Sequence, residues 1–339
     1  MARKRSDFLK RPITHPEIDP KVTVAQLLHA MEGTAFQAKN LALAVEVWKG
    51  MLKADATIFF GLAGAMVPAG MRKIIAYLIK NRLIDCLVST GANLFHDVHE
   101  TLGNHHWQGC AVVDDERLMD EGIDRMYDVF ALEREFNEAD EYIYRFSRTL
   151  DTDRPYTTRE FLYLLGKTLS EDCKEDGILT SAYKAEVPVY CPAIGDSSIG
   201  IALAMRPKEK NIIFDVVEDV KETALLVAMA RNTGVVFVGG GTPKNFIQQT
   251  EVTAYLMGKR VSGHKYAIQI TTDSPHWGGL SGCTFEEAQS WGKIAKKAKK
   301  VTVHCDSSIA LPIIVTAVVQ GMRSIKRNIP KFKFPLRSG

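Results

Sequence analysis

Short apolar segments that alternate with helical segments constrain the fold of this chain most strongly. Strand-like segments occupy residues 56–61, 84–90, 211–215, 235–238, 266–271 and 301–305, whereas residues 68–81 carry apolar side chains at helical spacing. This alternation predicts an α/β fold with a mostly parallel sheet and helices on both faces. Because each strand ends in a loop of small or polar residues, we expect ligands to bind beyond the carboxyl ends of the strands.

The composition suits one large domain. The chain has 339 residues, of which 46% are hydrophobic and 24% are charged, and it can bury a sizeable core. We expect a domain over residues 21–322, flanked by a basic arm at residues 1–20 and a basic tail at residues 323–339, both solvated. Residues 114–180 are more charged, and we expect them to form a helical insertion or covering layer.

Charge and cysteine content exclude several classes of protein. The formal net charge of +3 is too small to indicate a nucleic-acid partner. The six cysteines include no Cys-x-x-Cys pair, which argues against a zinc ribbon, a thioredoxin motif or a disulfide framework. No window approaches the ~18 apolar residues of a membrane span, and no apolar segment follows the basic N-terminus. We therefore expect a cytoplasmic protein with no membrane partner and no secretion signal.

One segment, residues 281–294, suggests lysine chemistry. It places Lys293 close to Trp291 and to the acids Glu286 and Glu287. A lysine becomes a nucleophile when burial or nearby like charge favours its neutral form. A tryptophan face with carboxylates suits an alkylamine cation. A simpler interpretation is that Lys293 begins a solvated basic stripe on one face of a helix, followed by Lys296, Lys297 and Lys300.

Three consecutive glycines, Gly239, Gly240 and Gly241, follow the apolar segment 235–238 and precede a helix-like segment. Glycines at such a junction let backbone N–H groups approach a pyrophosphate, whose charge the helix N-terminus favours. The spacing is not Gly-x-Gly-x-x-Gly, so the motif alone is weak, and an ordinary tight turn explains it equally well.

Four segments together resemble the deoxyhypusine synthase family. They are residues 190–200, 238–244, 290–294 and 306–312, and their order and spacing match the family along most of the chain. The resemblance implies a single large, Rossmann-like domain of the deoxyhypusine synthase type that uses NAD. It implies that Lys293 is the covalent catalyst. It also implies a homotetramer with sites at dimer interfaces.

The resemblance further implies NAD contacts at the strand ends. These are the glycines Gly239, Gly240 and Gly241, together with Thr90, Gly91, Asp196, Thr272, Gly278, Ser281 and Asp306. An aspartate at the carboxyl end of a strand suits a ribose hydroxyl or a nicotinamide amide. Taken alone, each of these positions is an ordinary loop residue.

The polyamine pocket implied by the resemblance departs from the family pattern. Glu287 and Trp291 are retained, so one end of an amine could still be held. Ile201, Leu280 and Asn245 stand where well-studied members carry acidic residues or a histidine. We therefore expect Glu287, Trp291 and Asn245 to contact a substrate whose charges are fewer or differently placed.

The reaction implied by the resemblance is NAD-dependent aminobutyl transfer from spermidine, or a related polyamine, through a lysine imine to an acceptor amine. The acceptor is a lysine of the translation factor eIF5A in the family, whereas some similar proteins use putrescine and make homospermidine. His96 stands where the family has a glutamate, and a neutral histidine could take over proton transfer. On an ideal helix Glu286 lies nearer to Lys293 than Glu287 does, so Glu286 is an alternative partner.

Two other enzyme classes have weaker support. Residues 64–72 faintly resemble the NAD loop of sirtuin deacylases, but the zinc-binding cysteine pairs of those enzymes are missing. A metallohydrolase could use His96, Asp97, His99, His105 and His106, but these are not in His-Glu-x-x-His order. We therefore expect no metal.

Overall fold

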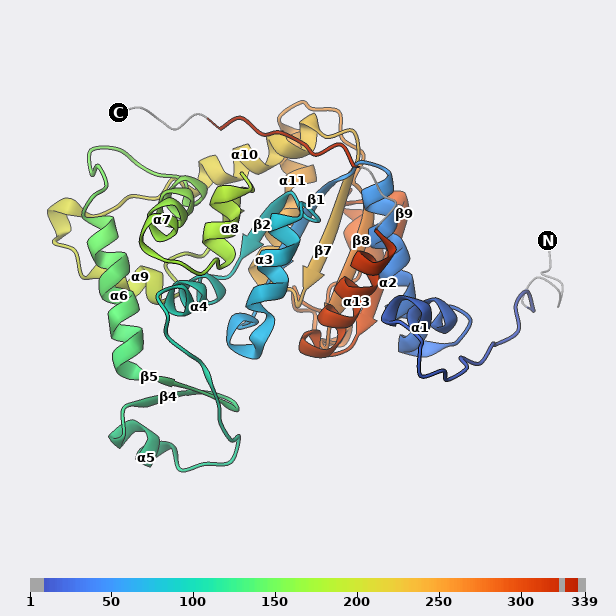
Figure 1. The fold of residues 1–339 in the computed structure, drawn as a ribbon. Helices are drawn as coiled ribbons and strands as arrows, with labels where there is room; N and C mark the ends of the chain where they lie inside the picture. Colours follow the sequence, from blue (N-terminus) through green and yellow to red (C-terminus); the bar gives the residue numbers. More distant parts are fainter. Residues whose placement is uncertain (1–8, 323–326, 335–339) are drawn as a thin grey trace.

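The computed structural model describes residues 9–322 and 327–334, and a six-stranded sheet runs through its centre (Figure 1). In spatial order the strands are β6 (Val189–Tyr190), β2 (Cys86–Ser89), β1 (Thr57–Leu62), β7 (Thr233–Val238), β8 (His264–Thr271) and β9 (Ile294–His304). Every neighbouring pair in this sheet is parallel. The predicted α/β fold with a parallel sheet is confirmed.

Helices cover both faces of the sheet. In Figure 1, α2 (Phe36–Lys53), α3 (Arg72–Lys80) and α13 (Ser307–Gly321) lie in front, and α10 (Val216–Met229) and α11 (Gly241–Leu256) lie behind. Successive residues of β1 point to opposite faces. Ile58 and Phe60 pack into the core that contains Trp48 of α2, whereas Phe59 packs into the core that contains Ile247 of α11. Burial on both faces explains why the strands are continuously apolar.

The remaining elements are further helices and one small sheet. The α-helices are α1 (Val24–Met31), α4 (Gly91–Thr101), α5 (Asp115–Asp120), α6 (Glu133–Ser147), α7 (Thr158–Asp172), α8 (Ile178–Lys184), α9 (Ser198–Ala204) and α12 (Phe285–Ser290). Tighter or wider turns are η2 (Val67–Met71), η3 (Lys208–Lys210) and η4 (Pro275–Trp277). The expected helix over residues 68–81 is thus α3 with η2 before it.

Residues 114–180 contain more than the helices that we expected. β4 (Ile123–Met126) and β5 (Val129–Leu132) form an antiparallel hairpin, which pairs with β3 (Trp107–Gln108) in a three-stranded sheet. With α5 this hairpin projects below α6 in Figure 1. Its strands are only partly buried, so they lack the clean alternation of apolar and polar residues that would have revealed them.

The strand expected at residues 211–215 is wrong. Phe214 makes a single bridge to Tyr156 and does not join either sheet. Ile213 is largely exposed, and the side chain of Asp215 accepts a hydrogen bond from the Glu218 N–H, capping α10. The apolar segment therefore leads into a helix cap, and the two-residue strand β6 takes the place at the sheet edge.

The helical interpretation of the lysine-rich segment is also wrong. Residues 294–304 form β9, the edge strand of the sheet, so Lys296, Lys297 and Lys300 are on a strand. Lysines are common on edge strands because their charge prevents another chain from pairing there. The basic cluster is thus a feature of the sheet edge.

A buried ion pair joins three helices beside the sheet. Arg72 of α3 donates from Nε to Asp97 of α4 at 2.8 Å, and both side chains are almost fully buried. Asp97 also accepts from the backbone N–H groups of Ile178 and Leu179 at 2.7 and 2.9 Å, at the N-terminus of α8. A carboxylate at a helix N-terminus meets both unpaired donors and the positive end of the helix dipole.

The described part of the tail, residues 327–334, is anchored to the sheet, although Asn328, Ile329, Lys331 and Lys333 are exposed to solvent as expected. Arg327 pairs with the buried Asp85 and donates to the carbonyl oxygens of Ala56 and Arg82, at the amino ends of β1 and β2. Arg82 donates in turn to the Pro330 carbonyl at 3.0 Å. The tail therefore crosses the edge of the sheet opposite to the carboxyl ends of the strands.

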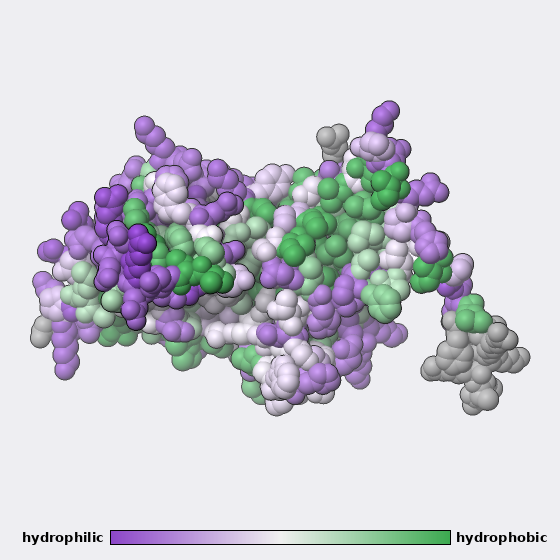
Figure 2. Space-filling view, turned by 90° about the horizontal axis from the view of Figure 1, so that it is seen from below, coloured by the Kyte–Doolittle hydropathy of each residue, from purple (hydrophilic) through white to green (hydrophobic). Residues whose placement is uncertain are grey.

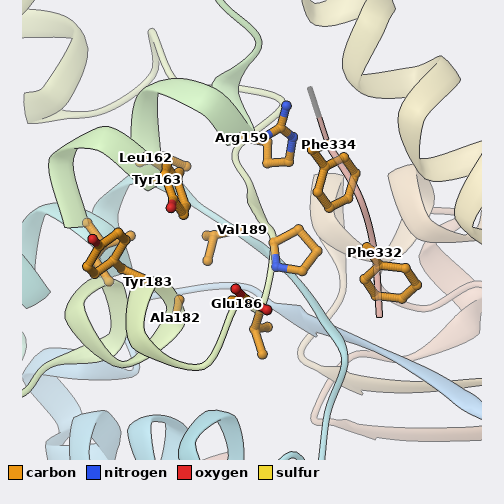
Figure 3. A pocket seen from close by; sticks show the side chains of 12 residues that line it. Arg159, Leu162, Tyr163, Ala182, Tyr183, Glu186, Val189, Phe332 and Phe334 are labelled. Carbon is orange, nitrogen blue, oxygen red and sulfur yellow. The ribbon is translucent and has the colours of Figure 1, made fainter. Parts of the chain in front are cut away.

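Two aromatic residues of this tail close a pocket at the same edge (Figure 3). Phe332 and Phe334 line a cavity of about 180 Å³ together with residues of α7, α8 and β6. The Arg159 guanidinium lies 4.3 Å from the centroid of the Phe334 ring and pairs with Glu222 at 2.7 Å. A cation above an aromatic face holds the tail in place.

Replacing Arg327 with lysine should lower stability moderately. An ammonium keeps the charge but cannot reach Asp85 and both carbonyl oxygens at once, so a buried acceptor loses its partner, at a cost of about 1–3 kcal/mol. Denaturant unfolding would measure the change in the free energy of unfolding. Lys333→Arg, at an exposed position of the same segment, is the matched control and should change little. An Arg327→Lys protein as stable as the control would contradict the anchoring.

Candidate functional site

The loops at the carboxyl ends of the strands carry most of the predicted cofactor residues. Thr90 follows β2, Asp196 follows β6, Thr272 follows β8 and Asp306 follows β9. Figure 2 looks onto this edge and shows hydrophobic residues gathered in patches between hydrophilic ones. The side chain of Asp306 accepts from Ser308 N at 2.8 Å and so caps α13. The order of the strands places these loops in a row along one edge of the sheet.

Near β2 and β6, two predicted residues lie in closely packed loops. The Thr90 hydroxyl donates to the Gly64 carbonyl at 3.0 Å, and Asn93 donates to both of them. Gly91 begins α4, and a Cβ there would lie 2.3 Å from the Ser197 hydroxyl oxygen. Only glycine lets α4 approach the loop that carries Asp196 so closely.

The triple glycine joins β7 to α11 and meets the loop that leads to α12. Gly239 and Gly241 have positive φ values of 72° and 55°, which glycine adopts at little cost. A Cβ on Gly240 would lie 2.3 Å from Cα of Ser281. The Gly241 N–H donates to the Ser281 hydroxyl at 3.0 Å. The structure therefore brings the glycines and Ser281 together at a helix N-terminus, a favourable place for an anionic group.

Lys293 lies between α12 and β9, and neighbouring backbone groups fix its main chain. Its N–H donates to the Ala288 carbonyl at 3.1 Å, and its carbonyl accepts from the His264 N–H at 3.0 Å. Gly292, with φ 73°, makes the turn from the helix into the strand. The Lys293 ammonium lies 5.4 Å from the centroid of the Trp291 ring, within the range of a cation–π contact.

Lys293 lines a pocket with a volume of about 170 Å³. Five other residues singled out from the sequence line the same pocket: Asn245, Gly278, Leu280, Glu287 and Trp291. The walls not expected from the sequence are Lys244, Gln248, Gly279, Cys283 and Ala288. The pocket thus combines an amine nucleophile, one carboxylate and an aromatic face.

The structure distinguishes the two neighbouring glutamates. Glu287 lines the pocket, whereas Glu286 is mostly exposed and pairs with Lys300 at 2.9 Å. That ammonium lowers the pKa of Glu286 through its hydrogen bond. Glu286 is therefore paired with a lysine of the edge strand β9, and Glu287 is the carboxylate available to a bound amine.

His96 and Ile201 do not line the pocket that contains Lys293. Ile201 lies largely exposed on α9. His96 is buried on α4, where its Nδ1 lies 3.0 Å from Nε2 of His106. Burial, assisted by the charges of His106 and His99, lowers the pKa of His96 to about 3. His96 is thus neutral at physiological pH, and a pKa this low makes it a weak proton acceptor within a single copy.

The histidines near His96 form a hydrogen-bonded cluster. His106 contacts Glu100 through Nδ1 at 2.7 Å, and His99 packs against the Phe136 ring at 4.9 Å between centroids. Among residues 9–322 and 327–334, no group of three or more His, Cys, Asp or Glu side chains is arranged to hold a metal ion. The cluster therefore gives no support to a metallohydrolase.

Lys244 is a residue of the site that sequence reasoning missed. It lies inside one of the segments that carry the family resemblance, yet its position after Gly-Gly-Gly-Thr-Pro resembles that of a solvated lysine in a helix's first turn. In the structure it is only 1% exposed. Burial lowers the pKa of its ammonium to about 8.

A family model described as deoxyhypusine synthase matches residues 26–318 of the chain. The chain belongs to the deoxyhypusine synthase family. Members of this family are transferases, and the enzyme described here is therefore a transferase. This finding confirms the resemblance predicted from the four motif segments. The deacylase and metallohydrolase alternatives lose their basis.

Related proteins align with this chain over nearly its whole length. A probable deoxyhypusine synthase 2 of Methanosarcina mazei is 53% identical over 315 residues, covering 92% of this chain and 91% of the relative. A deoxyhypusine synthase-like protein of Coxiella burnetii is 34% identical over 323 residues, covering 93% and 91%. The crystal structure of a putative deoxyhypusine synthase from Entamoeba histolytica has the same fold, with a TM-score of 0.63 and 18% identity over 94% of this chain and all of that one.

Within the part of the chain that the structure describes, no helix is long and apolar enough to cross a membrane.

Proposed function

We propose that this deoxyhypusine synthase family member catalyses NAD-dependent transfer of an aminobutyl group from spermidine, or a related polyamine, to an acceptor amine through an imine on Lys293. The observation that carries the proposal is the single pocket that holds Lys293, Glu287 and Trp291. Ser281, on the loop that leads to this pocket, touches the triple glycine at the start of α11.

The fit of NAD rests on the shape of the glycine loop. Gly240 leaves no room for a side chain beside Ser281, and the N-terminus of the 16-residue helix α11 lies at the same place. The Gly240 N–H and the N-terminus of α11 would face the pyrophosphate, while Gly239 and Gly241, whose N–H groups donate to the Ile270 carbonyl and the Ser281 hydroxyl, would let it approach the backbone closely. Thr90, Gly91, Asp196, Thr272, Gly278, Ser281 and Asp306 would contact the rest of the cofactor. When bound, NAD supplies a hydride acceptor for the first step and the hydride donor for the last.

The protein groups act on the amine. Glu287 and Trp291 would hold an ammonium end by charge and by the aromatic face. Loss of hydride from the carbon beside the secondary amine of spermidine gives an imine. The Lys293 amine would add to that carbon, 1,3-diaminopropane would leave, and the aminobutyl group would remain on Lys293 as an imine. The acceptor amine would then displace Lys293 and take the aminobutyl group as a new imine, and because the hydride that NAD supplies would equal the one it accepted, no net oxidation would occur.

The site needs a cover, because imines hydrolyse in water. Three large apolar side chains are largely exposed in a single copy. Leu280 and Trp291 line the pocket, and Trp277 lies in the loop before it. We propose a homotetramer in which dimer interfaces cover these residues. His96 can act as the base for Lys293 only if the interface brings a second copy close, since the two do not share a pocket within one copy. The six free cysteines suit a reducing, cytoplasmic setting.

NAD should stabilise the protein, because a ligand that binds only the native state raises the free energy of unfolding, by about 2.7 kcal/mol at a hundredfold excess over Kd. Gly240→Ala should remove this gain, since its methyl group would displace Ser281. Melting temperatures with and without NAD would measure both effects. The control is Gly321→Ala, where the new methyl group meets only the end of the Lys49 side chain. An unchanged melting temperature of the wild type at saturating NAD would contradict the cofactor assignment.

The acceptor has two candidates. The family pairs spermidine with a lysine of eIF5A, but Leu280 and Asn245 line this pocket where acidic or histidine partners stand in well-studied members. A buried ammonium without a carboxylate is costly. This substitution favours the alternative, in which a small amine such as putrescine is the acceptor and homospermidine is the product.

The two acceptors can be compared directly in the wild type and in Leu280→Asp. We expect the wild type to prefer putrescine to eIF5A. A new carboxylate at position 280 should raise the use of acceptors or donors with an additional ammonium. Product analysis by mass spectrometry, with 1,3-diaminopropane release as the measure of the first half-reaction, would decide. Efficient modification of eIF5A together with no use of free diamines would show that the hypothesis is wrong.

A further inference from the structure

Lys244 holds the loop before α12 through all three of its N–H groups. Its ammonium donates to the Cys283 carbonyl at 2.6 Å, to Oε1 of Gln269 at 2.9 Å and to the Ser281 carbonyl at 3.4 Å. All three acceptors are uncharged, and within the described ranges no carboxylate forms an ion pair with this lysine. A buried ammonium is retained in such a place only when oxygens satisfy each of its donors.

Gln269 of β8 connects this lysine to the triple glycine. Its Nε2 donates to the Ser281 carbonyl at 2.7 Å and to the Gly239 carbonyl at 3.0 Å, while Oε1 accepts from Lys244. These partners fix the orientation of the amide, since carbonyl oxygens require the NH₂ group. One buried side chain on the central sheet therefore holds both loops that meet at Gly240 and Ser281.

The same contacts set the start of α12. Cys283, whose carbonyl Lys244 binds, directly precedes Thr284, and the Thr284 hydroxyl accepts from the Glu287 N–H at 3.1 Å as the helix cap. α12 carries Glu287, and the chain after it carries Lys293. Lys244 lines the pocket itself. A shift of this loop would therefore move the glycine contact and the amine pocket together.

We propose that Lys244 and Gln269 are positioning residues that couple the triple-glycine loop to the Lys293 pocket, so that the geometry of one depends on the other. The inference rests on the proposed function, because it takes the glycine loop as the NAD site and Lys293 as the nucleophile. Neither side chain is assigned a reaction step. Their effect is on where Ser281, Glu287 and Lys293 lie.

The coupling should depend on pH, because burial lowers the pKa of Lys244 to about 8. The charged or titratable groups that act on it are Cys283 and Glu287 around α12, Asp273 after β8, and Lys293. Below pH 8 the ammonium holds the loop. Above it, the folded protein loses this proton while an unfolded lysine keeps it to about 10.4. Global stability thus does not fall over this range, since the unfolded state binds more protons there. NAD affinity should nevertheless weaken.

The first test is Lys244→Met, which keeps the length of the side chain and removes its donors. We expect NAD affinity at pH 7 to fall at least tenfold, with slower borohydride trapping of the Lys293 imine. Lys300→Met is the matched control, because Lys300 binds Gln289 and Glu286 outside the pocket and should leave NAD affinity unchanged. NAD affinity of Lys244→Met within twofold of the wild type would overturn the proposal.

The second test does not depend on whether the Lys244→Met protein folds. Gln269→Glu places a carboxylate against the Lys244 ammonium and should raise the pKa of the lysine, because an opposite charge favours the charged form. The loss of NAD affinity above pH 8 should then move to higher pH, although the lost NH₂ group leaves the Ser281 and Gly239 carbonyls without this donor and should lower the melting temperature at pH 7. An unshifted pH profile would overturn the coupling. Failure of the wild type to bind NAD would instead overturn the proposed function, so the two failures are distinguishable.

Discussion

Replacing Lys293 with arginine is expected to abolish aminobutyl transfer and the covalent adduct. A guanidinium keeps the positive charge beside Trp291 but is not available as a neutral nucleophile. With NAD and spermidine, borohydride should trap a reduced imine on Lys293 of the wild type, and mass spectrometry of the peptide that contains residue 293 should find none in the variant. Loss of this nucleophile should remove transfer entirely, since Lys244, the other lysine that lines the pocket, has its three N–H groups bonded to oxygens of Gln269, Ser281 and Cys283.

Two controls separate the loss of chemistry from the loss of structure. Lys296→Arg, on an exposed position of β9 three residues further, should retain full activity. Lys293→Arg itself should still gain thermal stability from NAD, because the triple glycine is unchanged. Full turnover by Lys293→Arg would refute the covalent mechanism.

The largest effect on stability is expected from Asp97→Ala. Removing this carboxylate leaves the Arg72 guanidinium buried without its main partner and takes away the acceptor for two N–H groups at the start of α8. Breaking one side of a buried ion pair typically costs about 3–5 kcal/mol. Denaturant unfolding would measure the loss in the free energy of unfolding.

The matched control is Glu141→Ala, which breaks an exposed ion pair with Arg145 on α6. Exposed pairs of this kind contribute about 0.3–0.5 kcal/mol, so this variant should remain close to the wild type. If Asp97→Ala loses no more stability than Glu141→Ala, the three-helix junction does not depend on the carboxylate.

The central sheet could be predicted because its strands are buried on both faces and therefore read as continuous apolar segments. The errors occurred where local pattern and tertiary position disagree. Residues 211–215 are as apolar as a strand but end in the helix cap Asp215. The lysines of β9 fit a helical wheel by chance, and only their place at the sheet edge explains them. The hairpin β4–β5 is too exposed to show alternation.

For the candidate site, the motif residues converge because they follow the carboxyl ends of parallel strands. Glu287, Trp291 and Asn245 line one pocket with Lys293, as expected of a substrate site. His96 is buried on α4 and does not line this pocket, a separation that residue spacing does not reveal. Lys244 could not be recognised because the groups that hold it are mostly backbone carbonyl oxygens, which every sequence has.

The backbone of Lys293 is hydrogen-bonded on both sides, to Ala288 and to His264, whereas Leu280 and Gly278 belong to a loop that contributes no strand. The main chain of Lys293 is therefore held by α12 and β8, and the side chain at position 280 can change without altering those two hydrogen bonds. Under the proposed function, substitutions in this loop would change which amine the pocket binds. The position of the Lys293 main chain would stay the same. Related enzymes would then share the reaction that depends on the sheet and differ in the amine substrate that the loop selects.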